Sequence, residues 1–226
     1  MKKKTIIISI ICTLIFVLIG TPLAITLSDI VQSHIIVDDY NNIKEKDEFQ
    51  TSYLIDGITL VRQKVSCGYA VMEMFGDFAN KNITEHELYK SNNDNIVTSS
   101  TTGFEKEMNK VFTSYETTAY TWLKSSDLIS KCYQSLKNGI PVPFEMAYKL
   151  NDSWTLHFSL LIGINLVKDE FRILNPYGYD EIMNSKEFIA HTSYEAWENM
   201  PIYLSWAFGL RIFDKNTIFI VNKKTI

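Results

Sequence analysis

The spacing of apolar and polar positions divides the chain into a helical first half and a second half of strands. Starting at Gly68, apolar side chains recur at helical intervals as far as Phe78, which predicts a helix with one apolar stripe facing a core. Cys67 then stands at the amino end of this helix. Residues typical of helix starts predict three more helices, at Thr84 with Glu87, at Thr102 with Glu105, and at Ser125 to Asp127, the last ending near Asn138-Gly139.

The second half consists of short aromatic and aliphatic runs separated by turn residues. The runs PVPFEMAYKL, LHFSLLIGINLV and EFRILNP predict consecutive antiparallel strands, with turns at Asn151-Asp152 and Lys168-Asp169. A helix is expected near SKEFIAHTSYEAWENM, followed by closing strands at FGLRIF and TIFIVN that are joined at Lys215-Asn216. Upstream, YLIDGITLV predicts a hairpin that turns at Asp56-Gly57. The predicted fold class is α+β, with helices first and an antiparallel sheet after them.

The N-terminal residues have a different character. MKKK precedes a nearly uncharged run that begins at Thr5 and continues to Leu27, which is long enough to enter a bilayer. We expect a signal peptide or an N-terminal membrane anchor over 1–28, a polar tether over 29–50 and one domain over 51–226. The domain is then expected outside the cell, either attached to the membrane through this segment or secreted.

Composition and charge narrow the class of protein. The chain has 226 residues, of which 46% are hydrophobic and 21% charged, as is typical of a folded globular protein. Its 22 basic and 26 acidic residues are spread along the chain, and no basic stripe follows the first four positions. We therefore expect no nucleic-acid partner.

Two cysteines, Cys67 and Cys132, lie beyond the N-terminal segment. A disulfide between them is the alternative to a reactive Cys67. A domain of this length buries enough apolar surface to fold without a disulfide, and Cys132 lies in the helical run LISKCYQSL, which favours a place in the core. No Cys/His cluster offers the further ligands that a metal ion needs, so we expect neither a metal nor another cofactor.

A reactive thiol needs neighbours that favour the thiolate, and both a helix N-terminus and an imidazole do so. His157 is the favoured imidazole because it opens the strand run HFSLLIGIN, although a buried structural histidine fits the same pattern. In a hairpin around Lys168-Asp169, Asn175 comes near His157 and could orient its ring. The other histidines are His34 in the tether, His86 in an acidic helix, and His191, which stays an alternative.

These stretches together resemble a known family. Gln63, SCGYA, LKNGIPV, LHFSLLIGIN and ILNPYG occur in the order found in the papain-like bacteriocin-processing peptidases, whose transporter-borne members cut leader peptides after a double glycine. The resemblance covers about residues 53 to 180 and implies a papain-like fold and a peptide or protein substrate. It also implies that Cys67 is the nucleophile, His157 the base, Asn175 the group that orients the imidazole, and Gln63 a donor to the oxyanion, with a thioester acyl-enzyme as the intermediate.

The chain departs from that family's pattern at three points. Gln63 lies four positions before Cys67, a shorter gap than in many relatives, and Asn175 stands where several relatives carry aspartate. No phosphate-binding Gly-rich Lys-Ser/Thr loop is present, so the chain is not expected to be a leader-cleaving transporter itself.

Two functions therefore stay open. The first is an extracytoplasmic cysteine peptidase, for which transfer of the acyl group to an amine is an alternative to hydrolysis. The second is a non-catalytic binding or immunity-type surface protein that keeps the papain-like fold. Aromatic side chains near the expected site are suited either to line a substrate groove or to pack: Trp154, Tyr177 and Tyr179.

Overall fold

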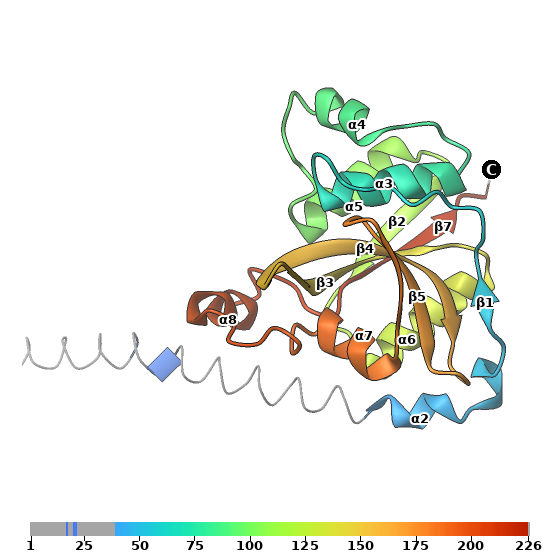
Figure 1. Ribbon diagram of the computed structural model, residues 1–226, viewed down its shortest axis with the longest axis vertical. Helices are drawn as coiled ribbons and strands as arrows, with labels where there is room; N and C mark the ends of the chain where they lie inside the picture. The colour runs from blue at the N-terminus through green and yellow to red at the C-terminus, as the bar shows by residue number, and fades with distance from the viewer. Residues whose placement is uncertain (1–16, 18–19, 22–38, 226) are drawn as a thin grey trace, which may run out of the picture.

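The computed structural model describes residues 17, 20–21 and 39–225 (Figure 1). The predicted signal peptide or membrane anchor over 1–28 and the first part of the tether fall almost entirely outside these residues. Within the part of the chain that is described, no helix has both the length and the apolar character needed to cross a bilayer.

One antiparallel sheet forms the centre of the molecule. Its strands lie in the order β2-β7-β3-β4-β5-β6, and the short β1 pairs with β4. The ladder from β3 to β6 follows the chain through successive hairpins, as the sequence predicts. The bounds are β1 (Tyr53–Leu54), β2 (Tyr115–Tyr120), β3 (Val142–Leu150), β4 (Ser153–Asn165), β5 (Glu170–Asn175), β6 (Tyr179–Met183) and β7 (Ile218–Lys223).

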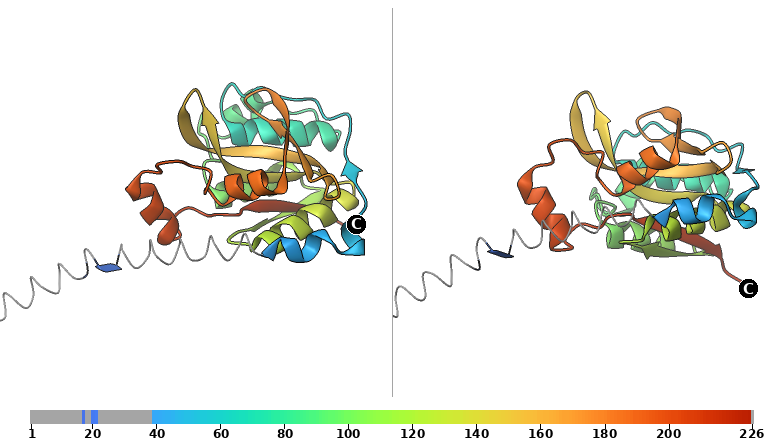
Figure 2. Two further views of the ribbon diagram at one scale, coloured as in Figure 1. Left: turned by 60° about the horizontal axis from the view of Figure 1, so that its bottom comes forward. Right: turned by 90° about the horizontal axis from the view of Figure 1, so that it is seen from below.

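Helices cover both faces of this sheet (Figures 1 and 2). The helices α3 (Cys67–Phe78), α4 (Glu85–Ser91) and α5 (Thr101–Val111) lie on one side, where the apolar stripe of α3 packs against β4. On the other side lie α2 (Asn41–Lys44), α6 (Ser125–Lys137) and α7 (Ser185–Thr192). Each face therefore has its own buried apolar core, and the α+β class is confirmed.

Residues 39–50 differ from the polar tether that the sequence predicts. They form α2 and the 3-10 turn Asp47–Phe49, and three apolar side chains on them join the core under α6: Tyr40, Ile43 and Phe49. The segment lacks a sustained apolar period because single anchoring side chains, rather than a continuous stripe, hold it to the domain.

The helix starts are set mainly by side-chain caps. The capping box of Thr84 and Glu87 is confirmed, and α6 begins and ends as expected. The box predicted at Thr102 is wrong, because Ser100 is the N-cap of α5 and accepts a hydrogen bond from Gly103 N. Glu105, the other half of the predicted box, instead accepts a hydrogen bond from Ala119 N on β2.

The hairpin predicted at Asp56-Gly57 is wrong. Only Tyr53–Leu54 forms a strand, and residues 55–66 run along the domain as an irregular segment. Among the described residues, no second strand pairs with this segment, and its backbone N–H groups donate to other neighbours. The Asp77 carboxylate accepts from Thr59 N, and the Pro176 carbonyl accepts from Gln63 N.

The C-terminal part also differs from the prediction. The run FGLRIF does not form a strand, because its first residues end the helix α8 (Ile202–Gly209) and the rest is irregular. The sheet instead gains β2, whose sequence YETTAY is too polar to predict a strand and which is held by pairing with β7. Lys215-Asn216 therefore does not join two strands.

Candidate active site

Cys67 is the first residue of α3, as the sequence predicts. The hydroxyl of Ser66 caps this helix by accepting a hydrogen bond from Tyr69 N at 3.2 Å. Gly68 lets the helix start press against the next segment, since a Cβ there would lie 2.5 Å from Thr98 Oγ1. Cys67 is half-buried and Cys132 is fully buried in the core, and both are free thiols. The disulfide alternative is therefore excluded.

His157 and Asn175 meet across the β4–β5 hairpin. Leu160 pairs with Leu174, and the register shifts near Gly163, so the two residues are close without being direct partners. The distance between His157 Nε2 and Asn175 Oδ1 is 2.9 Å, and the side chains are 2% and 0% exposed. The expected proximity is confirmed, but His157 lies inside β4 rather than at its start because the β3–β4 hairpin extends beyond it.

The hydrogen bonds of Asn175 define the tautomer of His157. Its amide nitrogen donates to Glu181 Oε1 at 2.7 Å, and its amide oxygen accepts from Tyr177 N at 2.9 Å. The oxygen that faces His157 is therefore an acceptor, so Nε2 of the ring must carry the proton and donate. Nδ1 is left with its lone pair, which is the form that a general base requires.

Two tyrosines cover the imidazole. The ring of Tyr177 stacks on His157 with 4.3 Å between the centroids and 2° between the planes. Tyr148 packs at 5.5 Å from the same ring, and its hydroxyl donates to Glu181 at 3.5 Å. These contacts exclude water from the bond between His157 and Asn175, and they hold the ring in one orientation.

Burial makes both members of the expected catalytic pair neutral at rest. It lowers the pKa of His157 to about 4, with the bond to Asn175 acting in the opposite direction. It also raises the pKa of the Cys67 thiol, although the backbone amides of Phe158, Gly68 and Cys67 itself oppose this shift. The backbone amides at the helix N-terminus thus lower the thiol pKa, as expected, but the loss of hydration on burial outweighs them and the net shift of the pKa is upward.

The Cys67 sulfur lies near the strand that carries His157, and no hydrogen bond between the two side chains is present within the described part of the chain. Cys67 packs in the same apolar cluster as Phe158, which follows His157 on β4, and the backbone of Phe158 acts on the thiol. Among the described residues, no hydrogen bond joins Cys67 to His157. Such contacts are often long in unliganded enzymes and shorten only when substrate binds.

The segment that carries Gln63 is tied to both halves of the site. Gln63 N donates to the Pro176 carbonyl at 2.7 Å, next to Asn175, while the buried Glu85 carboxylate accepts from Lys64 N and Val65 N. The side-chain oxygen of Gln63 is buried without a hydrogen-bond partner among the described residues. No hydrogen bond among the described residues therefore fixes this oxygen in its present orientation.

The remaining histidines do not join this group. His86 is exposed on α4, and His191 on α7 donates from Nδ1 to the Ala147 carbonyl at 2.6 Å. His34 lies outside the described residues. The sequence analysis did not find Glu181, because only the β5–β6 hairpin brings this carboxylate behind Asn175, and a single glutamate in a polar strand gives no pattern to notice.

The antiparallel sheet with a cysteine at a helix start, and a histidine and an asparagine on adjacent strands, defines the papain-like cysteine peptidase fold. The model of the Peptidase_C39 like family matches residues 55–202, and the chain belongs to this family. The structure is similar to the crystal structure of a double glycine motif protease from an AMS/PCAT transporter in complex with the leader peptide, with a TM-score of 0.50 and 14% sequence identity. That similarity covers 77% of this chain and 100% of the other. No curated protein matches the chain.

Proposed function

We propose that this protein is an extracytoplasmic cysteine peptidase that cleaves a peptide substrate through a thioester acyl-enzyme. The observation that carries the proposal is the bond from His157 Nε2 to Asn175 Oδ1, because it leaves Nδ1 unprotonated beside the helix start that bears Cys67. The location outside the cell is supported by the sequence of residues 1–28 alone.

In the first step, Nδ1 of His157 takes the thiol proton while the Cys67 sulfur attacks the substrate carbonyl. The backbone N–H of Cys67 has no partner within its helix, because the first turn of a helix leaves its donors free. This group and the rotated Gln63 amide are the donors to the oxyanion. As the intermediate collapses, the carbon–nitrogen bond breaks and the imidazolium returns the proton to the leaving amine.

In the second step, water attacks the thioester and His157 again takes a proton, so the acid product leaves and the thiol is restored. Asn175 keeps the ring in the required tautomer through both steps, and Glu181 fixes the orientation of Asn175. An imidazolium is disfavoured at this buried site, but the developing oxyanion supplies the opposite charge during reaction.

The direct test is cleavage of a diverse mixture of synthetic peptides by the purified full-length chain, followed by mass spectrometry. Wild-type protein should cut a subset of peptides at a defined position, and Cys67→Ala should cut none. Cys132→Ala, which removes the other thiol of the domain, is the matched control and should cut the same peptides. Equal cleavage by wild type and Cys67→Ala would contradict the proposal.

A non-catalytic binding protein is the second candidate, favoured by the neutral resting pair and by the missing bond between Cys67 and His157. The same experiment separates the two functions. A binding protein retains certain peptides on the immobilised chain and leaves every peptide intact, with the same set retained by wild type and Cys67→Ala.

A further inference from the structure

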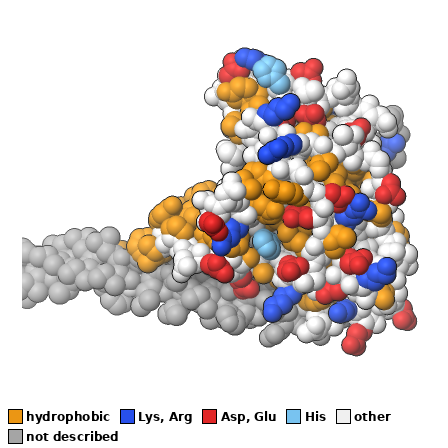
Figure 3. Space-filling view, viewed as in Figure 1, with side chains coloured by type: hydrophobic (Ala, Val, Ile, Leu, Met, Phe, Trp, Pro, Cys, Tyr) orange, Lys and Arg blue, Asp and Glu red, His pale blue; other side chains and the backbone are white. Residues whose placement is uncertain are grey.

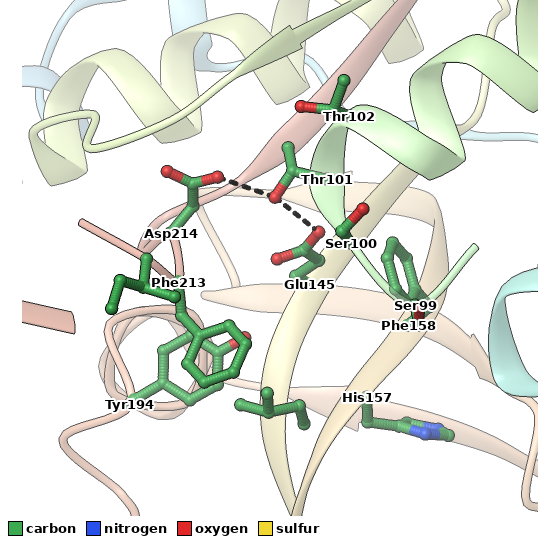
Figure 4. A pocket seen from close by; sticks show the side chains of 12 residues that line it. Ser99, Ser100, Thr101, Thr102, Glu145, His157, Phe158, Tyr194, Phe213 and Asp214 are labelled. Atoms are coloured by element: carbon green, nitrogen blue, oxygen red, sulfur yellow. Dashed lines mark hydrogen bonds between the residues drawn. The ribbon is translucent and has the colours of Figure 1, made fainter. Parts of the chain in front are cut away.

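A cavity of about 130 Å³ lies beside the candidate active site and has no part in the mechanism above (Figure 4). Segments far apart in the sequence enclose it: the start of α5, the paired strands β3 and β4, the chain just after α7, and the chain after α8. Its side chains include Thr101, Glu145, Phe158, Tyr194, Phe213 and Asp214.

The cavity lies near the nucleophile: Cys67 does not line it, but the backbone of its lining residue Phe158 acts on the Cys67 thiol. His157 and Phe158 line it from β4, with the imidazole of His157 pointing away from the carboxylates (Figure 4). Thr98 packs against Gly68, and the residues that follow Thr98 form another wall of the cavity. Glu145 lies close enough to raise the pKa of Cys67 when its carboxyl group is ionised. When a substrate is bound at Cys67, one of its side chains next to the reacting bond can therefore reach the cavity.

Two carboxyl groups meet at the floor of the cavity. The hydroxyl of Thr101 lies 3.0 Å from Glu145 Oε1 and 2.8 Å from Asp214 Oδ2. One hydroxyl proton serves two acceptors here, which favours protonation of one of the two carboxyl groups. Burial and the nearby Asp214 raise the pKa of Glu145 to about 8, although the hydrogen bond from Thr101 acts in the opposite direction, so Glu145 binds a proton far more readily than an exposed glutamate does.

The second oxygen of Glu145 points into the cavity. Glu145 is 8% exposed, and its first carboxyl oxygen is hydrogen-bonded to the hydroxyl of Thr101. A carboxyl oxygen that faces a cavity can accept a hydrogen bond from a ligand bound there. Asp214 is better satisfied, since it also accepts a hydrogen bond from Trp122 Nε1 at 3.1 Å.

The walls suit a long side chain with a charged end. Leu156, Phe158 and Phe213 offer apolar surface, while Ser99 and Ser100 are exposed at the rim, so the cavity is open from outside. None of the lining residues is a lysine or an arginine. Lys215, which follows Asp214, lies over the ring of Phe208 at 5.3 Å and does not line the cavity.

We propose that this cavity is a specificity site that binds a lysine or arginine side chain of the substrate next to the bond that is cleaved. The aliphatic stem packs on the apolar wall, and the cationic end binds Glu145 and Asp214 and displaces the proton from Glu145 to solvent. The inference rests on the proposed function. A substrate with glycine at the corresponding position leaves the two carboxyl groups without a cationic partner.

The test uses peptide probes that end in a vinyl sulfone, which a cysteine thiol captures by addition. Pairs of probes differ only in carrying lysine or its uncharged isostere norleucine, placed first or second before the reactive group. The second-order rate of Cys67 labelling on the full-length chain is measured by mass spectrometry. At one of the two positions, lysine should be favoured over norleucine by about 10-fold, as expected for one charge-assisted contact.

Three variants sharpen this measurement. Glu145→Gln keeps the size of the side chain and should reduce the preference for lysine to less than about 2-fold. Ser99→Arg places a cation at the exposed rim, leaves the core untouched, and should reduce the same preference. Glu107→Gln is the matched control, because Glu107 is a buried glutamate like Glu145 but lies on α5 outside the cavity and pairs with Lys110. It should leave the preference for lysine unchanged.

The outcomes separate the two proposals. Labelling of Cys67 at equal rates by lysine and norleucine probes overturns the specificity site and leaves the peptidase function standing. A preference that survives in Glu145→Gln also overturns it. Failure of every peptide probe to label Cys67, when a small alkylating reagent does so, overturns both proposals.

Discussion

Cys67 and Cys132 are the same chemical group in two different surroundings. Both are free, and burial raises the pKa of both thiols. Cys132 lies in the middle of α6, where only its own backbone amide opposes that shift. Cys67 lies at the start of α3, where the amides of Phe158 and Gly68 also oppose it. Burial alone therefore does not distinguish a reactive cysteine from a structural one, whereas nearby donors and a base do.

The largest effect that tests this comparison is the loss of catalysis in Cys67→Ala. We expect the rate of peptide cleavage to fall by about 10⁴-fold or more, because the covalent step is removed. Cys132→Ala should retain the wild-type rate and lose about 1–2 kcal/mol of stability through the small cavity it leaves. Cleavage rates and thermal unfolding of both variants are the measurements, and a large loss of activity in Cys132→Ala despite intact folding would break the comparison.

The next effect concerns the donors around the Cys67 sulfur. Gln63→Ala should lower kcat by about 10²-fold, because one of two donors to the oxyanion is lost. Gln63→Glu removes the amide donor but keeps the length, and we expect it to be at least as impaired. The labelling rate of Cys67 by iodoacetamide serves as the control, since alkylation forms no oxyanion and should change little. An unaltered kcat in Gln63→Ala would mean that the backbone N–H of Cys67 acts alone.

A smaller effect concerns the imidazole of His157, which is the proposed base for Cys67 and has no counterpart near Cys132 among the described residues. The pKa of His157 is about 4 in the folded chain and near 6.5 when unfolded, so the unfolded state binds more protons between these values. The free energy of unfolding should therefore fall as pH falls through this window, by roughly 3 kcal/mol. His157→Gln should lack this component, which urea unfolding at pH 7 and pH 4 measures. The same pH dependence in His157→Gln and wild type would show that the imidazole is not buried as described.

The sequence predicts the parts of this site that depend on local pattern. The apolar stripe after Gly68 places Cys67 at a helix start, and the turn at Lys168-Asp169 brings Asn175 to His157. In a hairpin, residues at similar sequence distances from the turn lie close together in space, so the position of the turn predicts which residues meet.

What the sequence does not predict depends on packing between distant segments. β2 is a strand because β7 pairs with it, and α8 has apolar residues that fit a strand pattern equally well. The neutral resting state of His157 follows from its burial under Tyr177, which no spacing of residues reveals. The floor of the cavity is hidden for the same reason, since Glu145 and Asp214 are far apart in the chain.

The rate at which iodoacetamide alkylates Cys67 at pH 7, in wild type and in His157→Ala, tests most directly whether the imidazole activates the thiol. We predict that His157→Ala slows alkylation of Cys67 by at least about 10-fold, while Cys132 stays unreactive in both folded proteins and serves as the internal reference. Equal rates of Cys67 alkylation in the two proteins would contradict the assignment of His157 as its base.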